Sequence, residues 1–282
     1  PVDAALGFAD DRGGGVTRLV VDRASGTLRS SNFVLTGTSR NCAGGPSPYG
    51  WLSCEEVDES GHGFVFLCDV SASELQAPHR LPALGRFSHE AAAFDAKTGI
   101  TYLTEDTSDS AIYRHVPNHI TRPFVGGELQ ALKVSGKDRF MLSEGRKVDE
   151  AFNVEWVSVP DPQALKASTR DQAHNAGAAF FSRGEGAWLA DHHVYLCSTD
   201  GGPTRRGQLY RLDISPGGED RLTLVAQAES NDSFDKPDNV TVSPWGDVFL
   251  AEDGDAPNRV RVLKPDGSLS YFAQNAVDGG DS

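Results

Sequence analysis

The feature that most constrains the fold is a recurring apolar strand that ends in acidic residues or cysteine. The final acids of successive copies lie 50, 94 and 53 residues apart. An interval of about 50 residues is typical of a repeated β unit, and the long middle interval holds two periods, or one period plus an insertion. The four copies span residues 51–56, 101–106, 194–200 and 248–253.

Each copy is the second strand of a longer unit. A first strand and a turn precede it, and two further strands follow, with hairpin turns such as Pro265-Asp266-Gly267. Four short strands in every unit are typical of β-propeller blades. A β-sandwich would need alternating strands but no such period. The third strands are expected at 63–67, 111–115, 208–212 and 259–263.

The chain is expected to form a single all-β propeller domain over residues 1–282, with about four full blades and a partial one. No linker or shift in composition divides it. Residues 16–36 are interpreted as the third and fourth strands of a blade whose first two strands are absent. The last strand also has no closing partner. Because an open propeller would expose unpaired strand edges, we expect the natural chain to be longer at one or both ends.

The formal charge of −14 disfavours nucleic acid and anionic membranes as partners, because both need a basic face. No stretch approaches the roughly 20 apolar residues of a membrane-spanning helix. The four cysteines show neither zinc-finger nor dense disulfide spacing. We therefore expect a monomer that acts on small molecules.

The geometry of a blade places the start of the first strand and the end of the second on one face, near the central channel. Both positions carry acids and amides in several units. Oxygen ligands of this kind suit calcium. For one blade alone, Asp-Asn and Glu-Asp pairs are better explained by turn and strand-end hydrogen bonds, but repetition in four blades favours a metal site. Its clearest members are Asp238, Glu252 and Asp253.

Cys54 stands directly before Glu55 and Glu56. A thiolate among carboxylates favours a transition metal such as iron over calcium, so Cys54 and Glu55 are predicted metal ligands. The other three cysteines are expected to be inert buried residues. His89 is as consistent with a structural role as with a functional one. Arg183 is the best candidate for an anion clamp, and no nucleophilic triad or phosphate-binding glycine loop is present.

Several runs together resemble the PhoX-type alkaline phosphatases, in order over most of residues 40–255. They are Asn41-Cys42-Ala43-Gly44-Gly45, Trp51-Leu52-Ser53-Cys54-Glu55-Glu56, Gly85-Arg86-Phe87-Ser88-His89-Glu90-Ala91, Gly184-Glu185-Gly186-Ala187-Trp188, Thr199-Asp200-Gly201-Gly202 and Pro237-Asp238-Asn239-Val240. The resemblance implies a six-bladed propeller, exported by the twin-arginine route to the periplasm or medium. It also implies hydrolysis of phosphomonoesters with an iron-calcium cluster in the channel.

The resemblance also assigns roles to residues. Cys54 matches the iron-ligating cysteine, Glu90 and Glu155 resemble iron-site acids, and Glu155 is also expected to take part in catalysis. Glu185, Asp238 and Glu252 resemble acids around the metal cluster. The family has Arg-Pro-Glu-Trp where this chain has Asn153-Val154-Glu155-Trp156, and Asn153 cannot replace the charge or the two-pronged grip of an arginine on phosphate.

The leading hypothesis is therefore metal-assisted hydrolysis of small phosphate monoesters. One alternative is a calcium-dependent lactonase or phosphotriesterase of the gluconolactonase-like propellers. Another is a propeller whose calcium is purely structural and which has no catalytic activity. Iron bound through Cys54 would separate the leading hypothesis from both alternatives.

Overall fold

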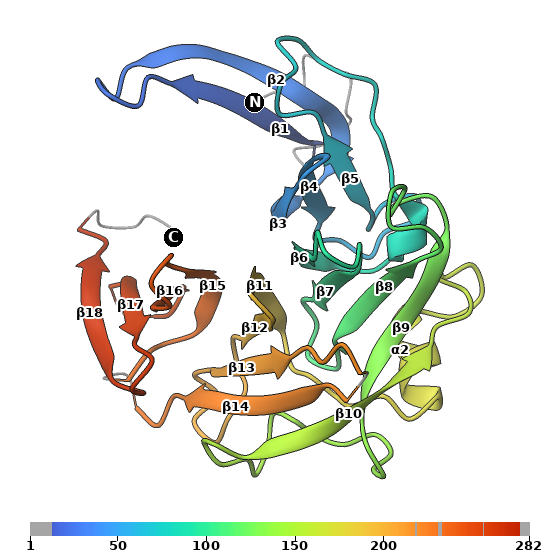
Figure 1. The fold of residues 1–282 in the computed structure, drawn as a ribbon, viewed down its shortest axis with the longest axis vertical. Helices are drawn as coiled ribbons and strands as arrows, with labels where there is room; N and C mark the ends of the chain where they lie inside the picture. The colour runs from blue at the N-terminus through green and yellow to red at the C-terminus, as the bar shows by residue number, and fades with distance from the viewer. Residues whose placement is uncertain (1–12, 218, 231–232, 256, 277–282) are drawn as a thin grey trace.

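The computed structural model describes residues 13–217, 219–230, 233–255 and 257–276. Its sheets stand side by side in an arc around a central axis, with the innermost strand of each sheet nearest the middle (Figure 1). Neighbouring strands within each sheet are antiparallel and mostly consecutive in sequence. This arrangement confirms the prediction of an all-β propeller.

The predicted repeat units correspond to four blades of the arc, two of which belong to one larger sheet. In each, the strand that begins the unit lies innermost and the later strands follow outward (Figure 1). The blades are β3 (Asn41–Ser47), β4 (Gly50–Glu55) and β5 (Val65–Cys68); β6 (His89–Phe94), β7 (Thr101–Glu105), β8 (Tyr113–Pro117) and β9 (Gly127–Val134); β11 (Gly184–Ala190), β12 (His193–Ser198), β13 (Gln208–Asp213) and β14 (Arg221–Gln227); and β15 (Pro237–Val242), β16 (Val248–Glu252), β17 (Arg259–Leu263) and β18 (Leu269–Gln274).

The first of these blades has three named strands instead of the expected four. At the fourth position a single bridge joins Phe66 to Arg80. The segment that carries Arg80 leads directly into a short 3-10 helix, η1 (Pro82–Leu84). Proline at the start of that helix cannot donate a ladder hydrogen bond, so the outer strand ends early.

The segment around Asn153, which the sequence left open as a remnant blade or an inserted loop, forms strand β10 (Ala151–Ser158). One half of β10 pairs with β9 and the other half with β14. It thus joins the outer edges of two blades into one nine-stranded sheet. The same insertion carries helix α2 (Thr169–Asn175), whose first turn is capped by the Ser168 hydroxyl accepting from the Asp171 N–H.

Residues near the start of the chain form the hairpin β1 (Gly13–Val21) and β2 (Leu28–Ser39). Among the described strands, these two pair only with each other, and they lie beside the first blade at one end of the arc (Figure 1). The sequence had placed two strands within residues 16–36, and the structure has them as this hairpin.

The inner strands approach one another closely because their residues are small. A Cβ added to Gly45 of β3 would lie 1.9 Å from the carbonyl oxygen of Ala92 on β6. All six residues of β6 are buried. This close packing brings the starts of the inner strands together at one end of the channel.

Candidate metal centre

Each inner strand has a β-bulge directly after its first residue. The register breaks after Asn41 in β3, His89 in β6, Gly184 in β11 and Pro237 in β15. A bulge turns the next side chain away from the regular alternation of the strand. The residues in this position are Cys42, Glu90, Glu185 and Asp238.

A second position is also equivalent in the four blades. It is the residue that follows the end of the second strand, and its N–H donates to the carbonyl of the residue that precedes the inner strand. The donors and acceptors are Glu56 and Arg40 at 3.0 Å, Asp106 and Ser88 at 3.0 Å, Thr199 and Arg183 at 3.1 Å, and Asp253 and Lys236 at 2.9 Å. Strand pairing thus holds two side chains per blade at the same end of the channel.

Three of these side chains form a group that could hold a metal ion. One ligand atom from each of Cys42, Glu56 and Glu90 lies within 4.8 Å of the others. The Cys42 thiol donates to Glu90 Oε1 at 3.2 Å. Glu90 is 1% exposed, and its Oε2 has no hydrogen-bond partner among the described residues. Because a buried carboxylate oxygen is costly without a partner, this atom fits a metal ligand.

Further acids extend the group. Burial, followed by the charge of Asp106, raises the pKa of Glu185 to about 10. Burial is also the main cause that raises the pKa of Glu90 to about 8, and it raises the pKa of Asp238. The charges of Glu90 and Asp238 contribute to the shift at Glu185, so these acids lie within one electrostatic field. Crowded carboxylates of this kind hold protons until a cation replaces them.

The Cys42 thiol also holds its proton in the absence of a metal. Loss of solvation, followed by the charge of Glu90, raises the pKa of the Cys42 thiol well above its ordinary value. Metals bind the thiolate form, so metal binding at this site would release the Cys42 proton. One thiolate among carboxylates fits a mixed site for a transition metal and calcium.

One cation faces these acids. Arg183 Nε donates to Asp106 Oδ1 at 2.8 Å and Nη2 to Asp106 Oδ2 at 2.7 Å. The same Nη2 lies 3.0 Å from Glu185 Oε1. The Arg183 side chain is 42% exposed, so it stands at the rim of the group.

The family model described as "Alkaline phosphatase PhoX" matches residues 23–281 of the chain. The chain belongs to the PhoX alkaline phosphatase family. No curated protein sequence matches it significantly. The resemblance seen in the sequence is confirmed, and membership makes the chain an alkaline phosphatase-like phosphatase.

The fold agrees with this family. The structure is similar to Pseudomonas fluorescens PhoX in complex with vanadate, a transition state analogue, with a TM-score of 0.66 and 17% sequence identity. The match covers 94% of this chain and 67% of that chain. A putative 6-phosphogluconolactonase from Bacteroides uniformis matches with a TM-score of 0.47 and 14% identity, over 91% of this chain and 76% of that one.

Within this PhoX-like site, two predicted ligands have structural partners. Glu55 accepts hydrogen bonds from the N–H groups of Ser39, Gly63 and Phe64 and contacts His62. Glu252 pairs with Arg261 at 2.8 Å, and both side chains are buried. These carboxylates fix loops at the ends of their strands, while their neighbours Glu56 and Asp253 take the position facing the site.

Cys54 and Glu155 do not join the group. Cys54 is 0% exposed and lies in an apolar cluster with Leu52, Val65 and Phe87. Glu155 is exposed on β10, where it pairs with Lys133 of β9 on the outer side of the sheet. Asn153 is also exposed on this outer strand, so its difference from the family arginine lies away from the acids.

The remaining predicted residues do meet. The charges of three predicted ligands, Glu90, Glu185 and Asp238, act on one another as described above. The charge of Asp253 also acts on Asp238. Sequence reasoning omitted Cys42, Glu56 and Asp106 from the site. Their signal was positional: each is the residue just inside the first strand or just after the second, in a repeat that the sequence had already revealed.

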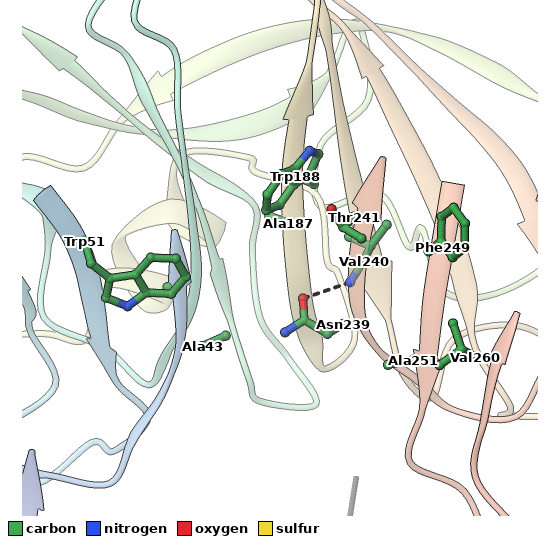
Figure 2. A pocket seen from close by; sticks show the side chains of 11 residues that line it. Ala43, Trp51, Ala187, Trp188, Asn239, Val240, Thr241, Phe249, Ala251 and Val260 are labelled. Atoms are coloured by element: carbon green, nitrogen blue, oxygen red, sulfur yellow. Dashed lines mark hydrogen bonds between the residues drawn. The ribbon is translucent and has the colours of Figure 1, made fainter. Parts of the chain in front are cut away.

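An apolar pocket of about 380 Å³ lies beside the acids. Its lining residues follow the site residues along the same strands: Ala43 and Gly44 after Cys42, Ala187 and Trp188 after Glu185, and Asn239 after Asp238. Figure 2 shows Trp51 of β4 on one side of this space, and Trp188 of β11 and Asn239 of β15 on the other. The pocket offers an apolar surface next to a strongly charged one.

In the described part of the chain, no helix has the length and apolar character needed to cross a membrane.

Proposed function

We propose that this chain hydrolyses phosphate monoesters at a calcium- and iron-loaded centre built from the bulged inner strands. The observation that carries the proposal is the buried Oε2 of Glu90, beside Cys42 and Glu56, for which the described part of the chain offers no hydrogen-bond partner. A buried carboxylate oxygen without a hydrogen-bond partner is costly, and a bound cation would remove that cost. Family membership supplies the reaction class.

Within this proposal the chain's residues have distinct roles. Cys42, with Glu56 and Glu90, would hold iron, because the ligand atoms of this group combine one sulfur with two carboxylates within 4.8 Å of one another. Asp106, Glu185 and Asp238 would hold calcium through hard oxygens. Such ions, when bound, neutralise the charge of the phosphate and activate water.

The substrate would lie between the charged and apolar parts of the site. Arg183 can grip a phosphate with the two-pronged geometry that it uses on Asp106. The pocket between Trp51 and Trp188 would receive the organic group of the ester. Small esters with an aromatic group, such as p-nitrophenyl phosphate, should therefore be good substrates.

We further propose that the chain acts as a monomer on small phosphorylated molecules, in the periplasm or outside the cell. The net charge of −14 supports the absence of nucleic acid as a partner. The proposed location follows from the family resemblance.

The test combines elemental analysis of the purified protein with p-nitrophenyl phosphate hydrolysis, before and after treatment with a calcium chelator. We expect bound calcium and iron, and activity that the chelator abolishes and calcium restores. Protein that hydrolyses the ester with neither metal would refute the proposal. Calcium without iron, together with lactone or phosphotriester hydrolysis, would instead favour the alternative enzyme class.

A further inference from the structure

The backbone of Arg183 has an unusual conformation, which the equivalent residues Arg40 and Lys236 share, with φ of +45° and +48°. Its φ is +43°, in the left-handed region that side chains with a Cβ rarely adopt. Its N–H donates to the Thr107 carbonyl, and its carbonyl accepts from Thr199. The backbone is therefore fixed on both sides, and the guanidinium is aimed at the acids.

The guanidinium bridges acids from two blades. Asp106 follows β7, whereas Glu185 belongs to β11, and a single nitrogen, Nη2, contacts both. The Asp106 contact is the main cause that raises the pKa of Arg183. In return, the charge of Arg183 opposes the upward shift of the Glu185 pKa. The Arg183 guanidinium thus contacts the same carboxylates that a divalent cation is expected to bind.

The equivalent positions in the other blades show that this contact is particular to Arg183. Arg40, Ser88 and Lys236 occupy the same place before their inner strands. Arg40 approaches Glu56 only to 3.9 Å, and its side chain is 58% exposed. Lys236 has a similar φ of +48° but lies 3.5 Å from the exposed Asp255.

We propose that Arg183 is a built-in counter-cation, which holds Asp106 and Glu185 in the metal-free protein and gives up these carboxylates when metal binds. The inference rests on the proposed function, because it takes the acids as metal ligands. It has two consequences. Arg183 stabilises the metal-free fold, and it competes with the metal. Metal loading also frees the guanidinium for the substrate anion, so phosphate would meet an available Arg183 only in a loaded site.

The test separates these effects with calcium as the probe. Calcium affinity is measured by calorimetry on chelator-treated protein, and thermal unfolding is followed with chelator and with saturating calcium. Arg183→Gln should lower the unfolding temperature in chelator yet bind calcium about three- to tenfold more tightly, allowing for the partly exposed ion pair. Lys236→Gln, the matched control, should change calcium affinity by less than about twofold, because its charge lies at an exposed pair.

A merely structural arginine would give the opposite sign. If Arg183→Gln binds calcium more weakly than the wild type, or loses equal stability with and without calcium, the inference is wrong. Arg183→Lys keeps the charge without the two-pronged grip, so its calcium affinity should exceed that of the wild type by less than that of Arg183→Gln does. The comparison of Arg183→Lys with the wild type remains possible if Arg183→Gln does not fold. A Lys variant that binds calcium more weakly than the wild type would also overturn the inference. Wild-type protein that binds no calcium would instead refute the proposed function.

Discussion

Cys42 and Glu90 come from the inner strands of two blades, and the Cys42 thiol lies 3.2 Å from the Glu90 carboxylate. The two strands, β3 and β6, are in direct contact. The bulges that follow Asn41 and His89 turn both side chains to the same place. A ligand pair is therefore created by blade packing, although 48 residues separate its members.

The two cysteines of the first blade should behave differently when they are replaced. Cys42→Ala should remove iron, measured by elemental analysis, with little change in stability because the thiol contacts Glu90 and not the apolar core. Cys54→Ala should retain the metals but lower the free energy of unfolding by about 1–2 kcal/mol, because it leaves a cavity in an apolar cluster. Loss of iron from Cys54→Ala alone would show that Cys54 is the iron ligand.

Replacement of Glu55 should mainly affect stability, whereas replacement of Glu56 should mainly affect metal binding. Glu55→Gln should destabilise the protein by about 1–3 kcal/mol in urea unfolding, because Glu55 accepts from the buried N–H groups of Gly63 and Phe64. Glu56→Gln should leave this stability almost unchanged and weaken metal binding in calorimetry. The opposite pattern would contradict the assignment.

The metal-free protein should lose stability as the pH rises. Glu90 and Glu185 have pKa values raised from 4.5 to about 8 and about 10, so the folded state binds more protons than the unfolded state over this range. The free energy of unfolding should then fall from about pH 4.5 up to these values. Thermal unfolding in chelator between pH 5 and 9 measures this loss of stability. Glu185→Gln should make the stability depend less on pH. Saturating calcium should do the same, and a rise in stability with pH would exclude this account.

The pocket beside the acids should set the preference for the organic group of the ester. Trp188→Ala should raise KM for p-nitrophenyl phosphate by roughly tenfold, because an aromatic contact surface is lost. KM for glycerol phosphate should change much less, since that group has little apolar surface. Equal effects on both substrates would show that Trp188 supports the fold and not the pocket.

An ion pair between buried Glu105 and partly exposed Arg170 lies next to Asp106. Arg170 Nη1 of α2 lies 2.7 Å from Glu105 Oε1, and Glu105 is fully buried. Arg170→Leu should lower the free energy of unfolding by about 3–5 kcal/mol, because it leaves the buried Glu105 carboxylate without its cation. Adding Glu105→Gln should recover much of the loss in urea unfolding. A double variant no more stable than Arg170→Leu would argue against this pairing.

Parts of the site were predictable because they depend on local pattern. Glu90, Glu185 and Asp238 each stand one residue inside a predicted first strand, and the structure brings all three into one electrostatic field. The choice between neighbours such as Glu55 and Glu56 was not predictable. It depends on a bulge and on which backbone groups the first acid meets, and neither is written in the strand pattern.

Glu155 shows a different limit. Its local sequence, an acid beside an aromatic residue in an apolar strand, resembles the strands that reach the channel. In the structure β10 instead lies at the outer edges of β9 and β14. Strand order within a sheet is set by contacts between segments far apart in sequence, so no local motif could place this acid.

The sequence by itself determined the repeat, the propeller and the face of the channel where acids gather. Period and alternation are properties of the chain, and they decide which strands pair with their neighbours. The tertiary structure alone decided which acids face one another, that Cys42 stands among them while Cys54 is buried in the core, and that Arg183 spans two blades. These are distances between blades, and packing of the inner strands sets them.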